Sequence, residues 1–82
     1  MAYLKYYGEL RELTGAEQEV YPGDDVKECL KHIKTVYGKE AYAEAKRSLI
    51  TVNGKGILNT GNYRTRIQDQ DEIRFLPLCG GG

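Results

Sequence analysis

The chain has 82 residues, enough for one domain with a single hydrophobic core. Twelve lysines and arginines balance twelve aspartates and glutamates, so the net charge of zero gives no general attraction to nucleic acid or to an anionic membrane. Two cysteines are too few for the disulfide framework of a small secreted domain, and no stretch has the roughly 18 apolar residues of a membrane span. We therefore expect a cytoplasmic protein that binds neither nucleic acid nor membrane.

The first region predicts a hairpin. AYLKYY (2–7) alternates, with Leu4 and Tyr6 on one side, which is typical of a strand with one buried face. In GELRELTG, which follows, two glycines bracket what we expect to be a single turn of helix. EQEVY (17–21) then predicts a second strand that returns beside the first.

The clearest element is an amphipathic helix over residues 26–37. Asp25 is a suitable N-cap, and Glu28 stands three residues later, as in a capping box. Gly38 stands where a left-handed C-cap is expected. An apolar stripe at helical spacing contains Val26, Cys29, Leu30, Ile33, Val36 and Tyr37. This stripe predicts that one face of the helix packs on a sheet.

A second, mostly exposed helix is expected over residues 39–48, with Tyr42 and Ala45 turned inward. LITVNGKGIL (49–58) places two short apolar runs around Asn53-Gly54, a strong hairpin signal. A polar loop follows.

The last strand is expected within IQDQDEIRFLP (67–77), after an acidic turn. Ile73 and Phe75 share one face of this strand, and Arg74 and Leu76 share the other. A right-handed crossover through the helix brings the first and last strands together as parallel neighbours at the centre of the sheet. The fold class is therefore α+β: a β-grasp, with a mixed sheet of four to five strands and one main helix on one face. We expect a domain over residues 1–77 and a flexible tail over residues 78–82.

The interior of the chain offers no active site. His32 is expected on the polar side of the helix, away from Cys29, so no metal site is predicted. Cys79 has no base or helix N-terminus near it that would activate its thiol. The lysines at positions 27, 31 and 34 fit the solvated back of an amphipathic helix. Attention therefore turns to the end, FLPLCGGG.

A carboxylate on a terminal glycine is ionised at neutral pH and has no side chain to crowd it. The five residues from Leu78 to Gly82 could span about 17 Å, enough to thread a narrow channel in another protein. Attack of that carboxylate on the α-phosphate of ATP would activate it as an acyl-adenylate. A partner must supply this chemistry.

These features resemble the MoaD-type sulfur carriers of the ubiquitin-like superfamily, the small subunits of molybdopterin synthase. Four segments carry the resemblance over nearly the whole chain. The first two are YLKYYGELRELTG at the start and DDVKECL at the main helix. The others are ITVNG at the hairpin and QDQDEIRFLP, which is followed by the terminal Gly81-Gly82. The chain departs from the family at Gln70, where the family has a turn glycine, and at residues 78–80, where the family has a second proline and small residues.

The resemblance implies a function and partners. Gly82 would be adenylated and converted to a thiocarboxylate, and Gly80 and Gly81 would be the threading segment. A MoeB-like adenylyltransferase would use the ATP, a sulfur donor would load the tail, and a MoaE-like large subunit would hold the acceptor, cyclic pyranopterin monophosphate. The chain itself would bind no cofactor. The resemblance further implies an apolar docking patch beside the tail, made by Tyr7, Ile57, Leu76 and Leu78.

Three alternatives stay open at this point. The acceptor could belong to thiamine synthesis or to tRNA thiolation, with the same chemistry. The chain could be a ubiquitin-like modifier that forms isopeptide bonds. It could also be a β-grasp interaction module whose glycine tail is inert.

Overall fold

The computed structural model describes residues 1–78, so the predictions about Cys79, Gly80, Gly81 and Gly82 lie outside the described residues. In chain order the elements are β1 (Ala2–Tyr6), α1 (Gly8–Thr14), β2 (Gln18–Tyr21), α2 (Val26–Tyr37), α3 (Lys39–Arg47), β3 (Leu49–Val52), β4 (Lys55–Gly56), the 3-10 helices η1 (Ile57–Asn59) and η2 (Asn62–Arg64), and β5 (Glu72–Leu76). No helix in this part of the chain has the length and apolar content needed to cross a membrane.

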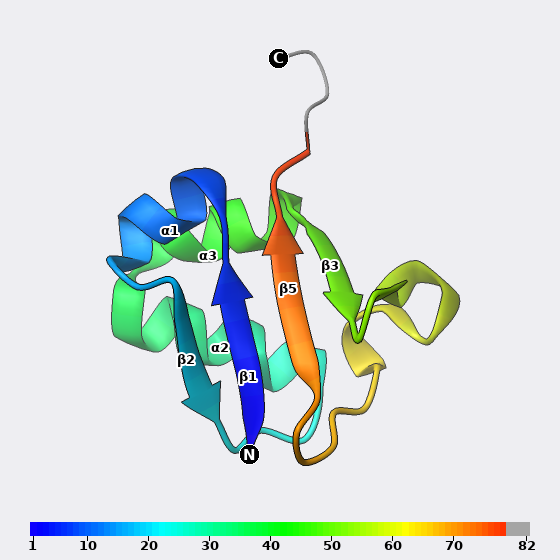
Figure 1. Ribbon diagram of the computed structural model, residues 1–82. Helices are drawn as coiled ribbons and strands as arrows, with labels where there is room; N and C mark the ends of the chain where they lie inside the picture. The colour runs from blue at the N-terminus through cyan, green and yellow to red at the C-terminus, as the bar shows by residue number, and fades with distance from the viewer. Residues whose placement is uncertain (79–82) are drawn as a thin grey trace.

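The sheet has five strands in the order β2-β1-β5-β3-β4. The central pair, β1 and β5, is parallel, and every other neighbouring pair is antiparallel. Figure 1 shows β1 and β5 side by side and pointing the same way, with the helices behind them. The predicted β-grasp, with its first and last strands as central neighbours, is confirmed.

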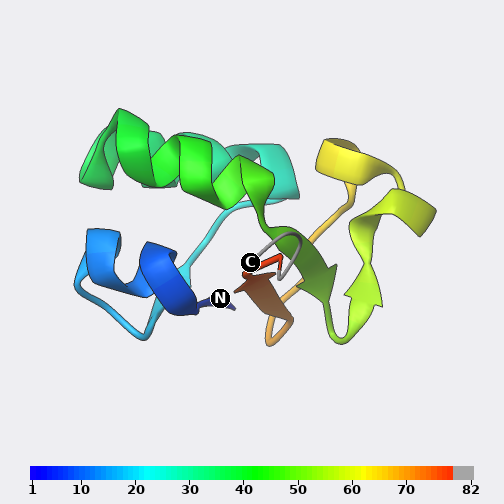
Figure 2. The ribbon, with the colours of Figure 1, turned by 90° about the horizontal axis from the view of Figure 1, so that it is seen from above.

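The core lies between one face of the sheet and the helices, which Figure 2 shows gathered on that side. Alternation along the central strands turns Leu4 and Tyr6 of β1 and Ile73 and Phe75 of β5 inward, and all four are fully buried. Ile33 of α2 is buried with them. Burial of these large apolar side chains is the main force that holds the helices on the sheet.

Helix α2 begins and ends close to the predicted positions. The carboxylate of Asp25 accepts a hydrogen bond from the backbone N–H of Glu28 at 2.8 Å. Glu28 reaches back to the N–H of Asp24 at 2.7 Å, one residue before the expected partner. Gly38 has the predicted positive φ of 98°, but its ψ of 178° is extended rather than left-handed, because α3 starts at the next residue.

Two predictions about the helices are wrong in detail. Val36 is 57% exposed, because it lies at the edge of the buried stripe and in the last turn. In α3, Ala45 is buried and Tyr42 packs half-buried against the core, as predicted, and Ala41 is buried as well. Helix α1 has seven residues rather than a single turn, because Leu10 anchors it in the core.

The end of the sheet at which β5 begins is closed by polar contacts. Asn53 and Gly54 both have positive φ, 52° and 86°, as the predicted two-residue hairpin turn requires. The Asn53 amide donates to Asp71 at 2.8 Å and accepts from the N–H of Glu72 at 2.9 Å, which ties the hairpin to β5. Gln70, where the family has glycine, takes the left-handed φ of 73°.

Candidate functional site

The chain leaves the domain at the end of β5, opposite the Asn53 turn (Figure 1). Pro77 packs against Gly8 at the start of α1: a Cβ added at Gly8 would lie 3.3 Å from the Pro77 ring. Gly8 also has a φ of +60°, so both its backbone angle and its close contact favour glycine. Leu76, the last residue of β5, pairs with Leu49, the first residue of β3. These contacts fix the position from which residues 78–82 start.

An apolar groove of about 340 Å³ lies beside this point, between the end of α3, β3 and the 3-10 helices. We call it the root groove; its apolar lining is Leu49, Ile50, Ile57, Leu58, Tyr63 and Leu78. Leu58 is 77% exposed and Leu78 is 63% exposed. A cluster of exposed leucines beside a cavity is typical of a surface that another protein covers.

The structure places the four residues predicted for the docking patch differently from one another. Leu78 lines the root groove and is exposed, whereas Tyr7 and Leu76 are half-buried. Ile57 is only 5% exposed, so it can contribute the floor of the groove but little of its surface. The cause is that β4 ends at Gly56 and η1 begins, which turns Ile57 into the core and Leu58 outward. Leu49, Leu58 and Tyr63 were not predicted from the sequence.

Tyr7 lies at the start of α1, where Gly8 touches the root of the tail. Arg11 places its guanidinium carbon 5.2 Å from the centre of the Tyr7 ring, a cation–π contact. The same side chain donates from Nε to the backbone oxygen of Tyr6 at 2.9 Å. Arg11 therefore holds the Tyr7 ring in place, with part of it open to solvent.

Cys29 is not available for chemistry at neutral pH. Its side chain is buried, and burial, together with the nearby carboxylates of Asp25, Glu28 and Glu19, raises the pKa of the thiol to about 12. A protonated, inaccessible thiol is neither a nucleophile nor a metal ligand. Among residues 1–78, no group of three or more His, Cys, Asp and Glu side chains is placed to hold a metal ion.

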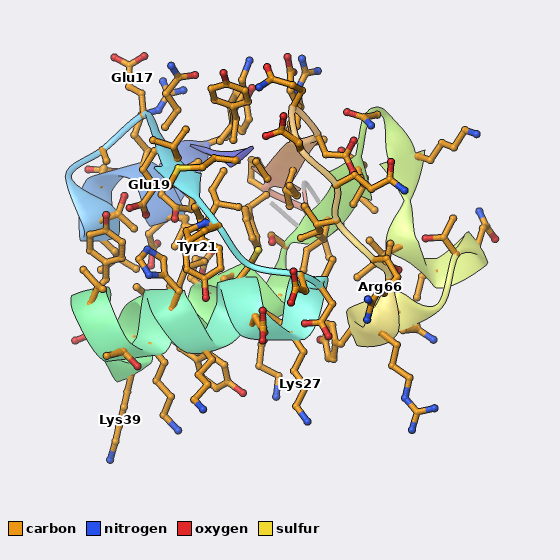
Figure 3. The ribbon with its side chains drawn as sticks, turned by 90° about the horizontal axis from the view of Figure 1, so that it is seen from below. Glu17, Glu19, Tyr21, Lys27, Lys39 and Arg66 are labelled. Atoms are coloured by element: carbon orange, nitrogen blue, oxygen red, sulfur yellow. The ribbon has the colours of Figure 1, made fainter. Side chains whose placement is uncertain are left out.

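Glu19 is a partly buried carboxylate beside the core. It stands opposite Leu4 in the sheet and points toward α2, whereas Glu17 points away from it (Figure 3). Its carboxylate accepts hydrogen bonds from the hydroxyls of Tyr6 at 2.5 Å and Tyr37 at 2.9 Å. The Nε2 of His32 lies 3.2 Å from the other carboxylate oxygen.

These contacts decide the ionisation of the group. Partial burial alone would raise the pKa of Glu19, but the hydrogen bonds from Tyr6 and Tyr37 and the nearby imidazole of His32 outweigh it and lower the pKa. The predicted position of His32 on the solvated side of α2 is wrong, because β2 covers that side and Tyr21 stacks on the imidazole at 4.4 Å. The cluster contains no unpaired nucleophile, and we interpret it as a structural tie between β2, β1 and α2.

Three comparisons place the chain among known proteins. The ThiS family model matches residues 4–82. Small archaeal modifier protein 1 from Methanosarcina acetivorans is 26% identical, with a TM-score of 0.84 over 99% of this chain and 95% of that chain. Curated protein sequences give no significant match.

Two further structures of similar fold are complexes. The BexX/CysO complex of Amycolatopsis orientalis contains a chain that is 19% identical, with a TM-score of 0.85 and full coverage of both chains. The complex of subunits 1 and 2 of the molybdopterin-converting factor from Helicobacter pylori contains a chain that is 24% identical, with a TM-score of 0.69 over 99% of this chain and 97% of that chain. Proteins of this fold therefore bind partner proteins. From the match over residues 4–82, the β-grasp sheet and these neighbours, the chain belongs to the ThiS family, a family of ubiquitin-fold sulfur carriers of the ThiS and MoaD type.

Proposed function

We propose that the chain carries sulfur as a thiocarboxylate on Gly82 and donates it as the small subunit of a molybdopterin synthase. The observation that carries this proposal is the exposed root groove at the base of a tail that ends in Gly-Gly. A docking surface beside the tail allows a partner to hold the domain while the reacting end enters its active site. The family and the Helicobacter pylori complex support the same assignment.

The chemistry takes place at the terminal carboxyl group. One carboxylate oxygen attacks the α-phosphorus of ATP, which forms the acyl-adenylate and releases pyrophosphate. Hydrosulfide supplied by the sulfur donor then attacks the acyl carbon, a carbon–sulfur bond forms, and AMP leaves as the acyl–phosphate bond breaks. Loss of the proton on sulfur leaves the thiocarboxylate, with no change of oxidation state. The adenylyltransferase binds the ATP and stabilises the charge on the phosphate, so this chain needs no cofactor of its own.

Each part of the site has a role in this scheme. Gly80 and Gly81 have no side chains and would thread the channel of the partner. Leu78 and Leu58 would supply the apolar contact on the groove side, and Tyr7 and Leu76 would extend it on the other side of the tail root. Ile57 would support this surface from below. Two partners would use the surface in turn, a MoeB-like adenylyltransferase and a MoaE-like large subunit.

A second candidate function is protein modification through an isopeptide bond. The observation in its favour is the likeness to small archaeal modifier protein 1, at 26% identity. Both functions begin with the same acyl-adenylate, and they diverge in whether sulfur or a lysine amine takes the acyl group. Carriage for thiamine synthesis or tRNA thiolation differs only in the acceptor.

The experiment is mass spectrometry of the C-terminal peptide after incubation with the cognate adenylyltransferase, ATP and a sulfur donor. We expect one oxygen to be replaced by sulfur in that peptide. Cys79→Ala should give the same change, because the scheme uses the carboxyl group and not the thiol. Deletion of Gly82, or addition of one residue after it, should abolish the change while the circular dichroism spectrum stays the same.

Two results would reassign the function. Full sulfur loading of a protein whose terminal carboxyl group is blocked would exclude the thiocarboxylate. Isopeptide-linked lysines in target proteins, formed in place of the thiocarboxylate, would assign the chain to protein modification.

A further inference from the structure

A second groove, of about 540 Å³, runs along the helical layer between α2, α3 and η2. We call it the lysine groove, because four lysines line it: Lys27, Lys31, Lys34 and Lys46. Leu30, Tyr42 and Tyr63 give it an apolar surface. Lys46 and Tyr63 also line the root groove, so the two grooves adjoin at these residues.

The positive charge in the lysine groove is only partly neutralised within the described chain, because four lysines line it and two carboxylates do. Over residues 1–78 none of the four lysines forms an ion pair. The two carboxylates in the groove, Asp25 and Glu28, accept backbone N–H groups at the start of α2 instead. An excess of positive charge therefore faces solvent in a concave site, where the field of neighbouring charges adds.

Two of the lysines are also held in place. The Nζ atoms of Lys34 and Lys46 lie 5.1 Å and 5.2 Å from the centre of the Tyr42 ring. Such cation–π contacts limit the side-chain freedom that binding would otherwise remove. The ammonium groups come from different helices, α2 and α3, and are brought together over one ring.

We propose that the lysine groove binds an acidic segment of a partner protein, whose neighbouring apolar side chain occupies the root groove. The proposal rests on the proposed function in one respect, that the partner also handles the tail. Because the two grooves adjoin at Lys46 and Tyr63, one polypeptide with an acidic segment beside an apolar side chain can fill both. A nucleic acid is disfavoured, because the net charge of zero gives no general attraction to a polyanion and because a phosphate backbone has no apolar side chain for the root groove.

The first test is an NMR titration of the full chain with the peptide Leu-Leu-Gly-Glu-Asp-Glu-Asp. We expect amide shifts at residues of both grooves, and binding that weakens as salt rises. Exchanging the four acids of the peptide for their amides should abolish the shifts at Lys34 and Lys46. Shifts confined to the root groove, and unchanged by that exchange, would overturn the proposal.

Two matched double variants distinguish the effect of charge inside the lysine groove from the effect of net charge. Lys34→Glu with Lys46→Glu reverses two charges inside the groove, and Lys39→Glu with Lys55→Glu reverses two outside it. Figure 3 shows Lys39 at the opposite end of the helical layer from Lys27. We expect the first pair to weaken peptide binding at least about fivefold and the second less than about twofold at low salt. Equal weakening by both pairs would overturn the proposal. A single-stranded decanucleotide that shifts the groove amides and binds more tightly than the peptide would do the same.

The second test uses the cognate adenylyltransferase and ATP–pyrophosphate exchange. The groove variant should raise the KM for the carrier about fivefold with kcat unchanged, because uniform binding is lost and the reacting carboxylate is not touched. A KM equal to that of the Lys39 and Lys55 variant would overturn the proposal. If the unmodified chain supports no exchange, the proposed function fails, and the peptide titration decides the groove independently.

Discussion

The two flanks of the central β1–β5 pair differ in the side chains that they turn inward and outward. On the β2 flank a carboxylate, Glu19, is turned inward, and three donors from the same chain reach it. On the β3 flank apolar side chains, Leu58 and Leu78 among them, are turned outward beside a groove. The carboxylate of Glu19 is satisfied by contacts within the domain, whereas the side chains of Leu58 and Leu78 stay largely exposed to solvent. The β2 flank therefore serves folding, and under the proposed function the β3 flank is the surface that a partner covers.

The largest expected effect comes from a charge placed in the core, which we compare with the same charge placed on the β3 flank. Ile33→Asp puts an unpaired charge in the core, and we expect it to unfold the domain, whose total stability is of the order of 5 kcal/mol at this size. Leu58→Asp, at an exposed site on the β3 flank, should change the free energy of unfolding by less than about 0.5 kcal/mol. Urea unfolding followed by circular dichroism measures both. Equal losses would show that the assignment of inside and outside is wrong.

A smaller effect is expected from Glu19→Ala. This change leaves the buried hydroxyl of Tyr6 without its acceptor, and we expect a loss of about 2–3 kcal/mol in the free energy of unfolding. Glu17→Ala is the matched control, because Glu17 is exposed and points away from α2 (Figure 3). Urea unfolding of the two variants should separate them clearly. A loss from Glu17→Ala as large as that from Glu19→Ala would argue for general charge effects over the hydrogen-bonded cluster.

The role of Glu19 should also appear in how the stability of the domain depends on pH. Because the pKa of Glu19 is lower in the folded state than in the unfolded chain, its ionisation stabilises the fold above the unfolded-state pKa, and this contribution is lost as the pH falls through the folded-state value. Between neutral pH and about pH 2 the unmodified domain should therefore lose more stability than Glu19→Gln, by about 1 kcal/mol or less since the carboxylate is partly solvated. Thermal unfolding across this range tests it. Parallel curves for the two proteins would remove Glu19 from the acid response.

The smallest expected effect is that of a substitution at Gln70, which lies outside both flanks. Gln70 holds a φ of 73°, a left-handed angle that glycine adopts without steric cost. Gln70→Gly should therefore stabilise the domain by about 0.5 kcal/mol, which corresponds to roughly 2–4 °C in Tm for a domain of this size. Calorimetry is sensitive enough to detect it. A lower Tm would mean that the long hydrogen bond from Tyr3 to Gln70, at 3.4 Å, contributes more than the strain costs.

Local patterns in the sequence predict the elements that depend on local rules. The stripe of α2 apart from Val36, the Asn53-Gly54 turn and the inward pair Ile73 and Phe75 follow from spacing and turn chemistry, and the structure confirms them. The sequence left open whether Gln70, where the family has a turn glycine, takes a left-handed angle or the turn differs, and the structure shows the left-handed angle.

The features that escaped prediction depend on contacts between distant segments. An inward Glu19 is tolerable only because Tyr6, His32 and Tyr37 come from two other elements to meet it. Ile57, which was expected in the docking patch, is instead in the core, and Leu58 is exposed, because β4 stops at Gly56 and no local signal in the sequence indicates that end. The root groove shares this origin, because its walls come from a helix, a strand and two 3-10 turns.

The pairing of β1 with β5 has a consequence for how the molecule is made. Residues 3–6 of the first strand find their parallel neighbours at residues 72–75, so the sheet cannot close until almost the whole chain has been synthesised. A chain that stops short of Glu72 lacks the central strand β5 and leaves one edge of β1 without its hydrogen-bonding neighbour. We expect such a fragment to stay unfolded and to be degraded by proteases. Every folded molecule therefore contains β5, the strand that precedes the tail. A fragment truncated before β5 does not fold, so it does not compete for partners that recognise the fold.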